Sequence, residues 1–161
     1  MRVFAAGFLI AGVVGCTAAP VLPAPPAGSA IVTFAFSASG DTMDVLITDS
    51  ATIARAEQRV ETGFGAAMPL GPIVRGVGSD SRYPFHYLAD EVRLVDLAME
   101  LCDGRPMRTP EAVDAFFEGA TGNRHASRAT WCPWGAQPIA VRRADQAAVS
   151  PRATRKAPGI R

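Results

Sequence analysis

The chain of 161 residues has the size of a single domain, and its 16 Lys and Arg against 15 Asp and Glu give a formal net charge of +1. Nucleic-acid binding depends on a clustered excess of basic side chains, so this balance excludes nucleic acid as an expected partner. The hydrophobic fraction of 48% is that of a globular chain, which here has room for only a small core.

Residues 1–15 have the pattern of an export signal. Arg2 precedes an apolar run of twelve residues, 3–14, which as a helix would span about 18 Å, less than the roughly 30 Å of a bilayer core. A positive start, a short apolar stretch and small residues are typical of a cleaved signal peptide rather than of a transmembrane anchor.

The end of this run, Val13-Val14-Gly15-Cys16, resembles the lipobox of bacterial lipoproteins. In that family the chain is cut before the cysteine, which carries acyl chains, palmitate among them, and two or three such chains anchor a protein stably. The resemblance implies that Cys16 is lipidated and that the protein lies in the bacterial cell envelope. If the host is Gram-negative, Thr17 implies the periplasmic face of the outer membrane. A secretory signal with an unrelated cysteine is the alternative.

The rest of the chain divides into three parts. Residues 16–30 are the lipidated cysteine and a proline- and alanine-rich tether, because proline fixes φ and removes backbone donors. Residues 31–143 are expected to form one globular domain. Residues 144–161 are basic, have little to bury and are predicted to be a disordered tail.

The first half of the domain predicts a β-hairpin, a helix and two short strands, from β-branched runs, turn residues and helix caps. In chain order these are a strand over 31–37, a turn at Gly40-Asp41, a strand over 44–48, a helix from Asp49 or Ser50 to Gly63 that buries Ile53, Ala56 and Val60, a Gly/Pro-rich passage over 63–72, and strands over 73–77 and 85–88 around a polar turn over 78–82.

The second half predicts a helix between two strands. Residues 92–102 fit the spacing of a helix and of a strand about equally, and we favour a strand. Thr109-Pro110-Glu111 is typical of a helix start, with a cap, a proline at the first position and an acid in the first turn. That helix is expected to run to about Gly119 with Val113, Phe116 and Phe117 turned inward, and a last strand to cover 137–142.

Besides Cys16 the chain has two cysteines, Cys102 and Cys132. An even pair in an exported domain predicts a disulfide, which would close a loop of about 30 residues. The alternative is a cysteine nucleophile served by His86 or His125. A pair of cysteines in an oxidising compartment does not favour it.

Trp131-Cys132-Pro133-Trp134 is the most distinctive tetrapeptide. Its two indoles could form a stacking platform for a sugar or peptide, or could pack over the disulfide, and we favour packing. If the indoles line a binding surface, its expected members are Trp131, Trp134, Tyr83, His86, Glu100 and Asp103.

Three motifs carry a family resemblance: Phe85-His86-Tyr87-Leu88, Glu100-Leu101-Cys102-Asp103-Gly104 and Trp131-Cys132-Pro133-Trp134. They resemble a small domain named after the N-terminal region of a eukaryotic calmodulin-binding protein, over about 44–134. This resemblance implies a shared fold and supports the pairing of Cys102 with Cys132, but it supplies no activity. Calmodulin is not expected as a partner, because no basic amphipathic helix is present in the sequence.

Catalytic and metal motifs are absent from the sequence, which contains no Gly-rich phosphate loop, HExxH, GxSxG or CxxC. His86 and His125 lie 39 residues apart, too far for a local metal motif, so neither a metal nor another cofactor is expected. The acidic stretch over 90–103 reads as a solvated face. Glu100 and Asp103 are its candidates for a polar site.

The predicted fold class is α+β, a small antiparallel sheet with two short helices and one disulfide. The predicted function is that of a membrane-anchored, non-enzymatic envelope module that binds an envelope protein or polymer. The alternatives are a small envelope hydrolase using His86 or His125 with a carboxylate, and a purely structural surface protein.

Overall fold

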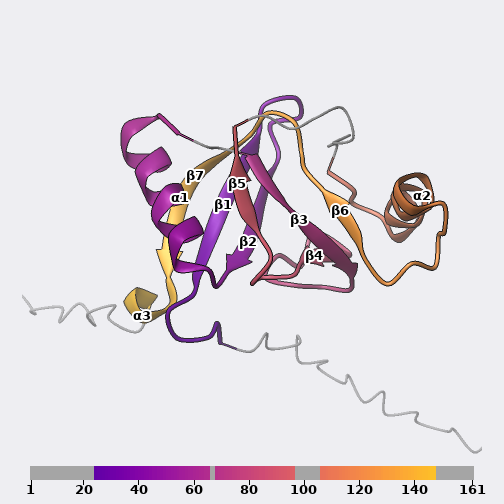
Figure 1. The fold of residues 1–161 in the computed structure, drawn as a ribbon, viewed down its shortest axis with the longest axis horizontal. Helices are drawn as coiled ribbons and strands as arrows, with labels where there is room; N and C mark the ends of the chain where they lie inside the picture. Colours follow the sequence, from indigo (N-terminus) through magenta and orange to yellow (C-terminus); the bar gives the residue numbers. More distant parts are fainter. Residues whose placement is uncertain (1–23, 66–67, 97–105, 148–161) are drawn as a thin grey trace, which may run out of the picture.

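The computed structural model describes residues 24–65, 68–96 and 106–147, and within them an α+β fold (Figure 1). In chain order the elements are β1 (Ala30–Phe36), β2 (Thr42–Ile47), α1 (Ser50–Thr62), β3 (Met68–Arg75), β4 (Phe85–Tyr87), β5 (Arg93–Val95), α2 (Pro110–Thr121), β6 (Ala129–Trp131), β7 (Ala136–Arg143) and α3 (Ala144–Ala147). The predicted α+β class is confirmed, but the strands form two antiparallel sheets rather than one.

The first sheet has the strand order β2-β1-β7. β1 and β2 form the predicted hairpin, and the Phe36 N–H donates to the Asp41 carbonyl at 2.8 Å as the turn closes. Gly40 takes a φ of 71° in this turn, a value that favours glycine. Residues of β1 and β2 alternate between buried and half-buried, so one face of the hairpin covers the core.

The second sheet is organised around β3, which pairs antiparallel with β4, β5 and β6. The prediction placed a strand over 73–77, whereas β3 starts earlier, at Met68, and ends at Arg75, so the two ranges share only residues 73–75. Pairing with β5 begins at Met68 and passes Pro69, in the passage expected to be irregular. The strand β6 was not predicted.

Helix α1 begins and ends where its caps predict. The Asp49 side chain accepts a hydrogen bond from the Thr52 N–H at 2.7 Å, and Gly63 closes the helix with a φ of 73°. Ile53 and Ala56 are buried as predicted. The prediction for Val60 is wrong, because only the first two turns pack on the core and its side chain is 40% exposed.

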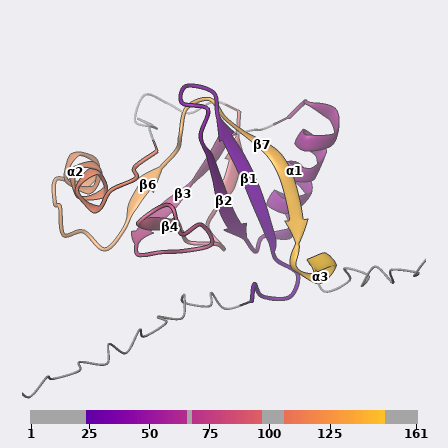
Figure 2. The same cartoon turned by 180° about the vertical axis from the view of Figure 1, so that it is seen from behind.

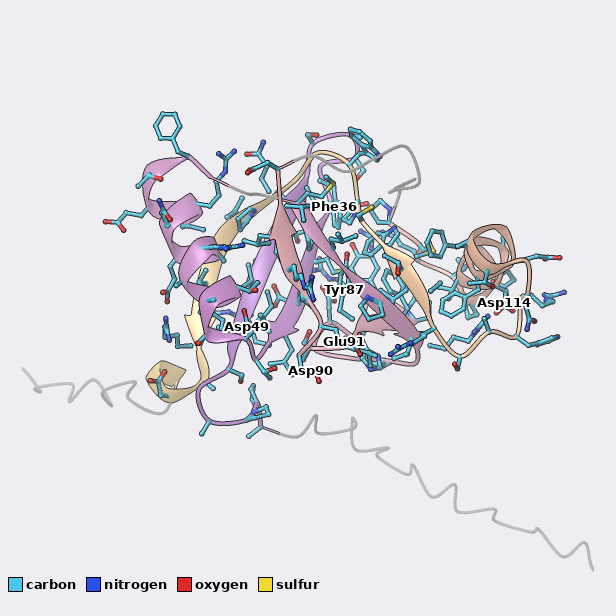
Figure 3. All side chains as sticks on the ribbon, in the orientation of Figure 1. Phe36, Asp49, Tyr87, Asp90, Glu91 and Asp114 are labelled. Atoms are coloured by element: carbon cyan, nitrogen blue, oxygen red, sulfur yellow. The ribbon has the colours of Figure 1, made fainter. Side chains whose placement is uncertain are left out.

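Helix α2 has the predicted start and is held by one arginine. Thr109 caps it, and Val113 and Phe117 are buried. Arg75 on β3 donates to Asp114 at 2.9 Å and lies over the Phe117 ring, 4.0 Å from its centroid. Figure 3 labels Asp114 on α2, at a distance from Phe36 and Tyr87 in the body of the strands.

One cluster of buried apolar side chains joins both sheets and both longer helices. The two helices lie on opposite sides of the strands, α1 beside β7 and α2 beside β6, as both views show (Figures 1 and 2). The two ends of the described domain meet where the Ala144 N–H donates to the Ser29 carbonyl at 2.9 Å. No helix in the described ranges has the length and apolarity needed to cross a bilayer.

Two further expectations are settled in part. Within 92–102 the structure confirms a strand over 93–95, and residues 97–102 lie outside the described residues. The tail was expected to be irregular from residue 144, but Ala144–Ala147 forms a single helical turn directly after β7. Residues 148–161 lie outside the described residues.

Candidate functional site

A groove with a volume of about 730 Å³ lies along β2 and is the candidate binding site. Its walls come from segments far apart in the chain, namely residues 24–26, 43–46, 77–80 and 85–89, with Ile31. Figure 2 shows β2 and β4, which contact each other, side by side. The volume falls in the range of sites that hold small molecules or short peptide segments, and the lining is mostly apolar.

The outer edge formed by β2 and the following Thr48 is closed at three positions by contacts from neighbouring segments. The Asp44 N–H donates to Asp80 Oδ2 at 3.0 Å, and Ser79 Oγ donates to the Asp44 carbonyl at 2.7 Å. The Tyr83 hydroxyl donates to the Thr42 carbonyl at 2.9 Å, and the Thr48 N–H donates to the Ala89 carbonyl at 3.0 Å. These contacts protect most of an exposed strand edge from pairing with another chain.

Asp80 holds one end of the groove together. Its side chain is buried and accepts bonds from the Asp44 N–H, the Arg82 N–H and the Arg82 guanidinium. Burial alone would raise the pKa of the Asp80 carboxyl, but the hydrogen bonds from Arg82 and from the two backbone N–H groups outweigh it. The pKa therefore lies below its ordinary value of 3.8.

Replacing Asp80 by asparagine should lower the free energy of unfolding at pH 7 by about 1.5–3 kcal/mol, because hydrogen bonds to a buried charge are lost. Since the pKa of Asp80 is lower in the folded state, its stabilisation is present above pH 3.8 and is lost as the pH falls through the folded pKa. Urea unfolding between pH 7 and pH 2.5 should show a smaller acid-induced loss in D80N than in the unmodified protein. Equal slopes would contradict this role.

His86 lines the groove with a fixed ring orientation. Its Nδ1 lies 3.0 Å from the Gly76 carbonyl, which can only accept, so Nδ1 carries a proton. In the neutral ring Nε2 is then an acceptor. The ring is also positioned by Gly78, where an added Cβ would overlap the His86 Cβ and lie 2.8 Å from Cγ.

Replacing Gly78 by alanine should therefore displace His86 and lower the free energy of unfolding by about 1–3 kcal/mol, as overpacking does. Chemical unfolding measures the loss, and the Nδ1 proton resonance of His86 reports whether its bond to Gly76 persists. Gly119 in α2 is a matched control, because a Cβ there meets no atom within 4 Å. An equal loss of unfolding free energy in G78A and G119A would show that the close approach of Gly78 to His86 does not contribute to stability.

The predicted binding surface does not form as one surface. Trp131 and Tyr83 are 1% and 0% exposed, so their rings are core residues and are removed from that surface. Trp134 is 50% exposed but does not line the groove. His86 is the only predicted surface residue found in the groove lining among those the structure describes. Cys16, Glu100, Cys102 and Asp103 lie outside the described residues.

The acid–base pair that a hydrolase would need is not formed by the residues that the structure describes. No carboxylate among them bonds either histidine. Asp80 is bound by Arg82, and Asp44 accepts from Thr33 at 2.6 Å and Arg142 at 2.6 Å. His125 is exposed in the segment between α2 and β6. No cluster of metal-ligating side chains occurs in the described part of the chain.

Sequence reasoning did not identify Asp44 and Leu46 as residues of a site, although both line the groove. Asp80 falls within the predicted polar turn over 78–82, where polar residues are expected for backbone reasons. The only available signal was the polar turn over 78–82, because the contact of Asp80 with Asp44 spans 36 positions.

The geometry described above defines a small α+β domain with an apolar groove beside an edge strand. Residues 29–145 match the family model for the N-terminal domain of the calmodulin-binding protein 74 family, and the chain belongs to this domain family. This agrees with the resemblance carried by the three motifs. No curated protein and no solved structure matches the chain.

Proposed function

We propose that the protein is a lipid-anchored, non-enzymatic module of the bacterial cell envelope that binds its ligand in the groove along β2. The observation that carries the binding role is the groove itself, an apolar recess of about 730 Å³ built onto an edge strand. The export signal over 1–15 and the lipobox cysteine Cys16 support the anchored location.

The proposed anchor and the groove are close in the chain. Ala24, Pro25 and Pro26 line the groove, and Cys16 stands only eight positions before Ala24. A tether of this length extended at about 3.1 Å per residue keeps the groove within roughly 30 Å of the acyl chains. The ligand is therefore expected to be a component of the envelope, either a protein or a polymer.

The intact mass of the protein from a membrane fraction tests the anchor. The expected mass is that of a chain beginning at Cys16 with added acyl chains, and the C16S variant should lack them. An unlipidated chain with the same membrane yield would overturn the proposed anchor.

Site-specific photo-crosslinking in cells tests the groove. A benzophenone side chain at Val77, which lines the groove and is 55% exposed, should give a defined adduct. The matched control is Ile139 on β7, which is 52% exposed and lies outside the groove lining. The Val77 adduct should disappear when Leu88, which also lines the groove, is replaced by arginine. No adduct, or the same adduct at both positions, would overturn the proposal.

A disulfide between Cys102 and Cys132 is part of the same proposal. Cys132 is 1% exposed and packs with Met68, Leu70 and Val95. Cys102 follows Val95 by seven positions, so a short segment is enough to connect the end of β5 to this cluster. An oxidising envelope compartment would keep such a bond intact.

A further inference from the structure

We infer that the ligand of the groove is an extended peptide that adds to the edge of β2 by pairing with the backbone of Leu46. This inference rests on the proposed function and names the class of ligand. The peptide would donate one N–H to the Leu46 carbonyl, accept one bond from the Leu46 N–H, and place an apolar side chain in the groove.

The direction of the Leu46 backbone follows from the hairpin register. The bond from Phe36 to Asp41 makes that pair hydrogen-bonded, and alternation then makes Val32 and Val45 a hydrogen-bonded pair as well. Leu46 lies opposite Ile31, and by the same alternation these two residues form a non-hydrogen-bonded pair. Its N–H and C=O therefore point away from β1 and toward the groove.

Leu46 is the gap in an otherwise closed edge. On one side Asp44 is capped by Ser79 and Asp80, and on the other the Thr48 N–H is bonded to Ala89. Within residues 24–65, 68–96 and 106–147, neither backbone group of Leu46 has a hydrogen-bond partner. The opening thus exposes one donor and one acceptor, which a single peptide residue satisfies together.

The surroundings of the gap favour an apolar peptide residue. Ile31, Leu46, Val77 and Leu88 line the groove near this edge, so polar backbone groups there have few other partners than water. An amide that replaces this water in a mostly apolar recess forms stronger hydrogen bonds than one on an open surface.

Two other occupants fit the opening less well. The edge of a second folded copy needs a run of unpaired positions, whereas here the contacts at Asp44 and Thr48 limit the opening to one residue. Of the chain's own lining residues, Pro25 and Pro26 have no N–H to donate to the Leu46 carbonyl.

The test measures hydrogen exchange of backbone amides by NMR in the chain from residue 16 onward carrying C16S. The probe is the peptide acetyl-KTVLVTK-amide at about 1 mM, a concentration suited to weak binding. Without peptide, the Leu46 amide should exchange about tenfold or more faster than the Val45 amide, which donates to β1. With peptide, exchange at Leu46 should slow about tenfold, while Val45 should not change.

A peptide N-methylated at its central leucine is the matched control, because it keeps the side chains but cannot donate at the paired position. It should leave Leu46 exchange unchanged. On the protein side, V77E should weaken the effect of the peptide and I139E should not, since only Val77 lines the groove.

Four results would overturn strand pairing. They are no slowing at Leu46 by the unmodified peptide, equal slowing by the N-methylated peptide, protection of Leu46 that depends on protein concentration, and protection without peptide that is lost when residues 17–23 are deleted. The last two assign the groove to a second copy or to the tether. A Val77 adduct in cells together with unprotected Leu46 would preserve the binding function and reject the peptide.

Discussion

Replacing Trp131 by alanine should lower the free energy of unfolding by about 3–5 kcal/mol, the cost of deleting a large buried aromatic side chain. The indole is 1% exposed and is surrounded by three rings. Its centroid lies 6.3 Å from that of Phe36, 4.9 Å from that of Phe85 and 5.5 Å from that of Tyr87. The substitution removes a side chain that contacts both sheets, so the cavity cannot be filled by one neighbour.

The control comes from the same tetrapeptide. Trp134 is 50% exposed, and W134A should change the free energy of unfolding by about 0.5 kcal/mol or less. Urea unfolding followed by far-ultraviolet circular dichroism measures both variants without relying on tryptophan fluorescence. If the two variants lose similar stability, the separation of the motif into one core and one surface indole is wrong.

Reducing the proposed disulfide between Cys102 and Cys132 should lower the free energy of unfolding by about 3–4 kcal/mol. This is the value that the chain-entropy model gives for a closed loop of about 30 residues. For a small core it is a large part of the net stability. The loop contains α2 and β6, so reduction should also increase hydrogen exchange in both elements.

The C16S background isolates this effect, because it leaves only the two cysteines in question. The free energy of unfolding is measured with and without reductant. The C102A/C132A double variant should be as stable as the reduced protein, and its stability should not change when reductant is added. Thiol alkylation of the folded, unreduced protein should add no mass after denaturation. Two alkylated thiols in that experiment would refute the disulfide.

The elements predicted best are those with local signals. Asp49 and Gly63 bound α1, and Thr109 begins α2, because capping depends on residues a few positions apart. The hairpin of β1 and β2 was equally readable from its alternation and from the turn at Gly40. The burial of Val60 could not be predicted in this way, since it depends on how many turns of α1 pack against the core.

The first part of β3 and the whole of β6 were not predicted, for a physical reason. Pro69 and Pro72 suggested an irregular passage, yet both lie in β3, where a neighbouring chain segment uses the Pro72 carbonyl as an acceptor for the Leu88 N–H. Gly71 allows Val92 to approach, since an added Cβ would lie 3.3 Å from its Cα. Such pairings depend on tertiary contacts, and strand propensity does not report them.

The groove could be predicted from the sequence even less well than β3 and β6. Its shape depends on the hydrogen bond between the Asp80 side chain and the Asp44 backbone. Its opening depends on the strand register, which directs the backbone N–H and C=O of Leu46 away from β1. Neither relation is visible in a single sequence, because both combine register with long-range contacts. The motif residues Tyr83 and Trp131 were noticed for their chemistry, which in this domain serves the core.

The bond between the Ala144 N–H and the Ser29 carbonyl also has a consequence for engineering. It brings the entry and exit of the domain to one point, so residues 29–144 can be inserted into a surface loop of a carrier protein without stretching that loop. A carrier of this kind would present the groove away from any membrane.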